Sequence, residues 1–160
     1  MNNICFDIII QNKKGNTMRP KNAIDQLAYE IEKGYKHLKE DPKYLGNDTS
    51  GAWVFVYDND DFCACALSCA AHTITNKKGD SLRDYMMNEG LENHSTKGIH
   101  IQENILRLCL KKDEWDEYKK TSNPSWDQTL HGIVIKLNDN CKINPIRIAE
   151  ILREIAKIVA

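Results

Sequence analysis

The alternation of apolar and polar positions predicts three strands along the chain. Residues 3–11 carry Ile or Phe at every second position, residues 52–57 read AWVFVY, and residues 132–137 read GIVIKL. Successive side chains of a strand point to opposite faces. Alternation of apolar and polar residues therefore indicates a half-buried strand, and a short continuous apolar run indicates a fully buried strand. The DNDD turn at residues 58–61 predicts a hairpin between 52–57 and the run that follows.

Apolar residues at helical spacing predict four helices, at about 20–40, 81–88, 101–120 and 145–159. The first has the clearest stripe, made of Ile24, Leu27, Ala28, Ile31, Tyr35 and Leu38. The last begins at Asn144-Pro145, an N-cap followed by proline at the first helical position. Residues 104–110 could instead form a strand, because three leucines alternate there.

The run 61–73, DFCACALSCAAHT, fits either regular structure. As a strand it would place Cys63, Cys65 and Cys69 on one face. As a helix it would align Cys65, Cys69 and His72 along one stripe. The preceding turn and the strand formers at 73–75 favour the strand, paired with residues 52–57.

This order of elements predicts an α+β fold with a mixed or antiparallel sheet of four to five strands and helices packed mainly on one face. The 160 residues fit a single globular domain, 1–160, and no low-complexity segment or linker divides it.

Charge and apolar content exclude several classes of protein. The 22 basic and 23 acidic residues give a net charge of -1, which argues against a nucleic-acid partner. No apolar run approaches the roughly 20 residues of a membrane span, and the N-terminus does not resemble a signal peptide. We therefore expect a cytoplasmic protein with no membrane partner, whose six cysteines are thiols.

The cysteine-rich run predicts core packing rather than a metal site. Zinc sites need four ligands at tetrahedral distances, and neither a strand nor a helix would bring Cys63, Cys65, Cys69 and His72 around one ion. Cysteine is often buried, and here it lies among alanines. We expect no metal, no cofactor and mostly buried thiols.

One short sequence occurs twice: NKKGNTMR at 12–19 and NKKGDSLR at 76–83. Each copy precedes a predicted helix, with Gly15 or Gly79 free to adopt positive φ and Thr17 or Ser81 as candidate N-caps. Basic residues near a helix start could bind an anion such as a phosphate or nucleotide, or could simply keep a turn solvated. The candidate ligands are Lys13, Lys14, Arg19, Lys77, Lys78 and Arg83.

The histidines offer one candidate for catalysis. His72 and His131 both lie on predicted strands, so they could form an acid–base pair of a hydrolase. Single histidines at strand ends are the alternative interpretation. Of the histidines, only His94 begins an H-x-[ST] triplet, His94-Ser95-Thr96.

Three functions therefore compete. A small non-enzymatic binding protein ranks first: an inhibitor, an immunity-type protein or a phage-encoded regulator that meets a protein partner through Trp115, Tyr118 and Trp126. A nucleotide- or phosphate-binding protein using the NKKG turns ranks second. A hydrolase using His72 and His131 ranks third.

Overall fold

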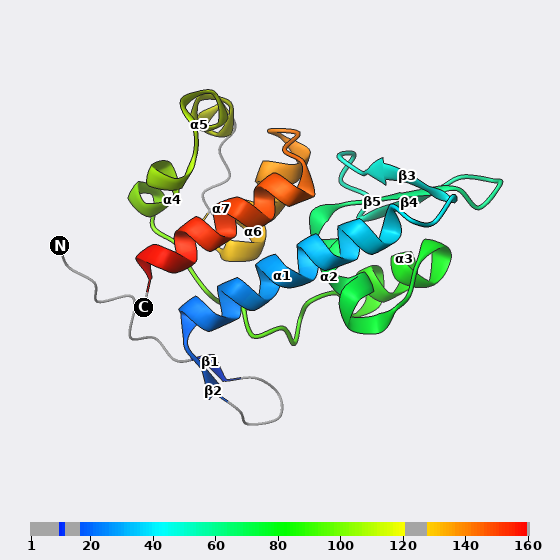
Figure 1. Ribbon diagram of the computed structural model, residues 1–160, viewed down its shortest axis with the longest axis horizontal. Helices are drawn as coiled ribbons and strands as arrows, with labels where there is room; N and C mark the ends of the chain where they lie inside the picture. Colours follow the sequence, from blue (N-terminus) through cyan, green and yellow to red (C-terminus); the bar gives the residue numbers. More distant parts are fainter. Residues whose placement is uncertain (1–9, 12–16, 121–127, 160) are drawn as a thin grey trace.

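Two amphipathic helices, α1 (Pro20–Leu38) and α7 (Pro145–Ile158), lie side by side through the middle of the protein (Figure 1). The computed structural model describes residues 10–11, 17–120 and 128–159. Both helices begin with proline at the first position, and Asn144 caps α7 by accepting a hydrogen bond from the Ile146 N–H at 2.8 Å. Their apolar stripes are buried, as predicted, and each helix keeps a charged face toward solvent.

Helices α2 (Ala66–Thr75) and α6 (Leu130–Asp139) complete the core. Helix α2 packs against α1 through small residues, and Gly34 of α1 lies directly against the backbone of Cys69. The Thr73 hydroxyl joins the two helices by donating to the Glu30 carbonyl at 2.6 Å. The alanine- and cysteine-rich run thus serves close packing, as the sequence suggested.

A three-stranded mixed sheet lies at one end of the molecule, beside α3 (Gly79–Asn88) (Figure 1). Its order is β3 (Tyr44–Asn47), β5 (Phe62–Ala64), β4 (Val54–Val56). The central β5 runs parallel to β3 and antiparallel to β4, and Phe55 faces Cys63 across the β4–β5 pair. The predicted hairpin is therefore confirmed, but its second strand ends at Ala64.

The remaining elements are short. Strands β1 (Ile10–Gln11) and β2 (Thr17–Met18) form a separate antiparallel pair before α1. Helices α4 (Glu103–Cys109) and α5 (Lys112–Lys119) replace the single helix predicted for 101–120. The strand alternative for 104–110 is wrong, since these residues lie mostly in α4. Most of the predicted strand 3–11 falls outside the described residues.

The α+β class is confirmed, but the predicted sheet of four to five strands is wrong for the part of the chain described, where the sheet has three strands beside seven helices. Residues 132–137, which were predicted as a strand, belong to helix α6. The Thr129 hydroxyl caps the start of this helix by accepting a hydrogen bond from the Gly132 N–H at 3.0 Å. Residues 66–75 are likewise helical. Both segments are apolar nearly all round, so their sequences lack the polar face that marks a helix.

Candidate functional site

The outer edge of β4 is the first feature that can bind another molecule. Residues 53, 55 and 57 form the main-chain hydrogen bonds to the neighbouring hairpin arm. For example, the Cys65 N–H donates to the Trp53 carbonyl at 2.9 Å, and the Tyr57 N–H donates to the Asp61 carbonyl at 2.8 Å. In an antiparallel pair the intervening residues point their polar groups the other way. The Val56 N–H and the carbonyls of Val54 and Val56 are therefore directed away from β5.

Helix α3 faces this edge across a groove of about 430 Å³. The groove is lined by residues 52–56 on the strand and by Arg83 and Met87 on the helix. Phe55 is 45% exposed, and Met87 is 68% exposed. The Phe55 ring lies 4.8 Å from that of Tyr57, which is 46% exposed. This end of the sheet thus presents apolar side chains to solvent next to main-chain groups directed outward.

Trp53, at the start of β4, has a strained backbone. Its φ is +65°, a region that bulky residues rarely occupy, and the Val54 N–H donates to the Ala52 carbonyl at 2.7 Å around it. Such tight γ-turns are uncommon and strained. The Trp53 carbonyl is held by two donors, the Cys65 N–H and the Ser68 hydroxyl, both at 2.9 Å. Strain of this kind concentrates at functional sites, and Trp53 lines both the groove and a second pocket.

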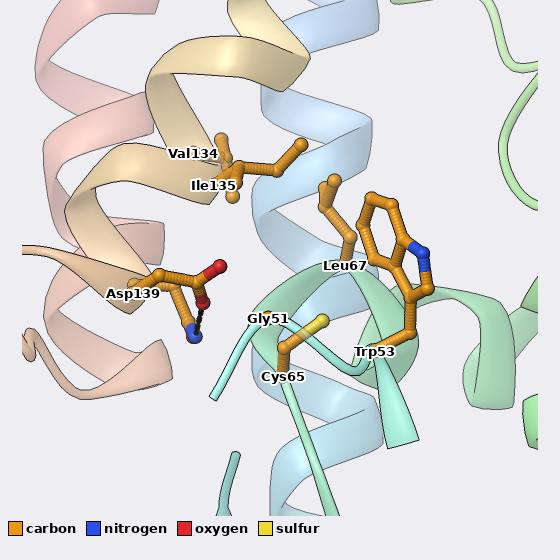
Figure 2. A pocket seen from close by; sticks show the side chains of 8 residues that line it. Gly51, Trp53, Cys65, Leu67, Val134, Ile135 and Asp139 are labelled. Atoms are coloured by element: carbon orange, nitrogen blue, oxygen red, sulfur yellow. Dashed lines mark hydrogen bonds between the residues drawn. The ribbon is translucent and has the colours of Figure 1, made fainter. Parts of the chain in front are cut away.

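The second pocket lies between α2, α6 and the segment before β4, and has a volume of about 210 Å³ (Figure 2). Trp53, Leu67, Val134 and Ile135 form apolar walls, and Asp139 contributes a carboxylate. Sequence reasoning missed both sites. The alternation of buried Val54 with exposed Phe55 was a usable signal for the groove, whereas nothing local marked Asp139.

The thiols lie where packing was predicted, with one exception. Cys65 and Cys69 are buried, while Cys63 is half-buried. Burial raises the pKa of the Cys65 thiol to about 11, and burial raises the pKa of Cys69 further. Both are therefore uncharged thiols at neutral pH, which disfavours nucleophilic chemistry. Within the described ranges no three His, Cys, Asp or Glu side chains are grouped to hold a metal ion.

A buried polar chain joins α1, the loop at 94–96 and α6. The Glu30 carboxylate accepts from His94 Nε2 at 2.6 Å, and the Thr96 hydroxyl lies 2.7 Å from both His94 Nδ1 and His131 Nε2. The Thr96 N–H also donates to His94 Nδ1 at 3.1 Å. The order carboxylate, imidazole, hydroxyl resembles a catalytic triad, but Thr96 is only 1% exposed. A substrate cannot reach its hydroxyl in this arrangement.

His72 has different partners. Its Nδ1 lies 2.7 Å from the Lys77 carbonyl and its Nε2 lies 2.7 Å from His37 Nδ1. Burial lowers the pKa of His72. His72 and His131 lie on helices α2 and α6, not on strands, and the structure gives each its own set of contacts. The proposed acid–base pair therefore has no geometric support.

The second NKKG turn leads into a helix, but not through the predicted Ser81 cap. Gly79 has φ +57°, as predicted, but α3 begins at Gly79, with Lys78 as N-cap and Ser81 already inside the helix. Lys78 forms an ion pair with Asp41 at 2.8 Å, and Arg83 forms one with Asp80 at 2.8 Å. Two of the three predicted anion ligands of this copy are thus already engaged by carboxylates.

The first NKKG turn cannot be compared with the second. Lys13 and Lys14 fall outside the described residues, and α1 begins after Arg19 rather than after Thr17. Whether the two turns form one anion site stays a prediction.

The predicted aromatic anchors lie partly within the fold. Tyr118 is 5% exposed and stacks on half-buried Trp115, with ring centroids 6.0 Å apart. The Arg107 guanidinium lies over Trp115, and Lys136 Nζ lies 4.1 Å from the Tyr118 ring centroid. Trp126 falls outside the described residues. Much of the aromatic surface is therefore covered by neighbouring side chains.

No protein-family model, curated protein or solved structure matches this chain. In the part of the chain that the structure describes, every helix is too short or too polar to span a lipid bilayer.

Proposed function

We propose that this protein is a non-enzymatic binding module that docks an extended segment of a partner protein against β4. The outward main-chain groups of this edge strand, next to the groove that α3 lines, are the observation that supports the proposal. Strand addition of this kind uses main-chain hydrogen bonds for affinity and alternate side chains for specificity. Inhibitors, immunity-type proteins and phage-encoded regulators, the classes suggested by the sequence, act through such surfaces.

The geometry defines how the segment would bind. Its backbone would pair with three groups, the Val56 N–H and the carbonyls of Val54 and Val56. Each such bond contributes only about 0.5–1.5 kcal/mol, so apolar contacts must supply the rest. Phe55 on the strand and Met87 on the helix stand on the two sides of the groove and provide them. We therefore expect one or two apolar side chains in the docked segment.

Charge complementarity favours a basic partner. The turn at 58–61 and α3 together contain five acidic residues, Asp58, Asp60, Asp61, Asp80 and Asp84, against one basic residue, Arg83. Asp58 and Asp60 are exposed beside the end of β4. Lysine or arginine flanking the apolar positions of a partner segment would meet this acidic rim, which would raise the association rate at low salt.

Selection from a random peptide library on the immobilised full chain tests this proposal. The expected peptides have alternating apolar residues flanked by Lys or Arg. Amide signals of Val56 and its neighbours should shift when such a peptide is titrated into labelled protein. Peptides that bind without perturbing residues 52–57 would overturn the proposal, as would a selection that yields no binder.

A pair of variants at one position separates the main-chain contact from the side chain. Val56→Pro removes the outward N–H and leaves the β5 ladder untouched, since Val56 does not bond to β5. We expect peptide affinity to fall about tenfold or more, whereas Val56→Ala, which keeps the N–H, should lose much less. Phe55→Ala should weaken binding by about 1–3 kcal/mol. Leu108→Ala changes an apolar residue on α4 that is more exposed than Phe55 (74% against 45%) and should have no effect.

A further inference from the structure

The pocket between α2 and α6 has the size and walls of a small-molecule site. Trp53 and Leu67 form one side and Val134 and Ile135 another, while Asp139 stands opposite Trp53 in this view (Figure 2). Its volume of about 210 Å³ exceeds that of an engineered cavity of about 150 Å³ that holds benzene. A ligand with one ring would therefore fit against the apolar walls.

The carboxylate of Asp139 is held firmly at the polar end of the pocket. Its Oδ1 accepts from Asn138 Nδ2 at 2.8 Å. Asn138 is itself fixed, since its Oδ1 accepts from the Ala66 N–H at 3.0 Å and its Nδ2 also donates to the Asp48 carbonyl at 2.7 Å. The second oxygen of Asp139, Oδ2, faces Gly51, whose missing side chain leaves room beside it: a Cβ there would lie 3.7 Å away.

The electrostatic surroundings of Asp139 favour a cation. Burial and the nearby Asp48 raise the pKa of Asp139, and they outweigh the hydrogen bond from Asn138 and the charge of Lys142, which lower it. Asp48 is 6% exposed, and its Oδ2 has no hydrogen-bond partner among the described residues. The neighbouring Lys142 ammonium donates to the Asp139 main-chain carbonyl at 2.7 Å, and within the described chain the Asp139 carboxylate forms no ion pair. A positive group in the pocket would compensate two adjacent, partly desolvated carboxylates.

We propose that this pocket binds a small organic cation in which an ammonium group is attached to a body of about one ring. The ammonium would lie against Asp139 Oδ2, and the ring would pack between Trp53 and the α6 wall formed by Val134 and Ile135. Cys65 also lines the pocket, as a thiol that is uncharged at neutral pH. This inference concerns the pocket alone and does not depend on peptide binding to the groove.

A matched pair of probes tests the proposal on the intact chain. Benzylamine and benzyl alcohol have nearly the same shape but differ in charge, and each can be titrated into isotopically labelled protein. We expect benzylamine to shift the signals of Trp53, Leu67 and Val134 and to bind at least tenfold more tightly than benzyl alcohol. Equal affinities would overturn the assignment of a cation site. Absence of shifts at these residues up to about 10 mM would overturn the site altogether.

Substitution of Asp139 supplies the second test. Asp139→Asn keeps the shape and removes the charge, so benzylamine should lose its tenfold advantage while benzyl alcohol binds as before. Because burial disfavours the charged carboxylate, this change should not destabilise the fold. Asp84→Asn, which neutralises an exposed carboxylate on α3, is the matched control and should leave both affinities unchanged. Benzylamine that binds Asp139→Asn as tightly as the wild type would contradict the proposal.

Discussion

Replacing Gly34 with alanine should destabilise the protein by about 3 kcal/mol, although alanine is the better helix former. In an exposed helix the exchange would gain about 1 kcal/mol from propensity alone. Here the added Cβ would lie 1.8 Å from the Cys69 carbonyl oxygen and 2.7 Å from Thr73 Oγ1. The first contact is with backbone, so it can be relieved only by moving α2 away from α1, which opens the core. Overpacking of this kind commonly costs about 1–3 kcal/mol and sometimes more.

Urea unfolding of the variant and two controls measures this effect. Lys33→Gly changes an exposed residue of the same helix and should cost only about 1 kcal/mol, which fixes the size of the propensity effect. Thr73→Ala in the Gly34→Ala background removes the side-chain clash but not the clash with the Cys69 carbonyl. We therefore expect no rescue. A Gly34→Ala protein as stable as the wild type would show that α1 and α2 are not in this close contact.

Local sequence predicts the elements that keep a polar face and misses those that do not. Helix α1 was predicted from its apolar stripe and α7 from its stripe and its Asn144 cap, because both helices keep charged residues on the face opposite the buried one. Helix α6 buries Leu130, Ile133, Val134 and Leu137, so its apolar run cannot be told from a central strand. Strand β3 contains Gly46 and gains its structure from pairing with β5, which no local pattern specifies.

The candidate sites were missed for a related reason. At the polar end of the pocket, Asn138 Nδ2 donates to the carbonyl of Asp48, which lies about 90 positions earlier in the chain. Asn138 and Asp139 thus meet Asp48 only in the folded protein. Likewise, the chain from Glu30 through His94 to His131 spans about 100 positions. Residue type alone indicated that histidines could matter, and led to the pairing of His72 with His131, which the structure does not support.

His131 should make the stability of the fold depend on pH between about pH 6.5 and about pH 4. Burial, followed by the nearby His94 and Lys97, lowers the pKa of His131 to about 4, against about 6.5 in an unfolded chain. Between these values the unfolded chain binds a proton that the folded protein excludes. Stability is therefore fully present above about pH 6.5 and falls as the pH decreases toward about 4. The total loss should reach about 3 kcal/mol, and the lowered pKa of His72 acts in the same direction.

Urea unfolding at pH values from 7.5 to 5 measures this contribution when the wild type is compared with a His131 variant. Carboxylates with lowered pKa values, such as Glu114, lose their contribution only below about pH 4.5, and Asp139, whose pKa is raised, titrates alike in both proteins. His131→Gln places an uncharged side chain of similar length beside the Thr96 hydroxyl. We expect its stability to fall much less steeply over this range than that of the wild type, whatever its stability at neutral pH. His100→Gln, which changes an exposed histidine, should retain the wild-type slope. Parallel curves for the wild type and His131→Gln would mean that His131 is protonated in the folded state as readily as in the unfolded chain, and that the buried chain from Glu30 through Thr96 accommodates the charge.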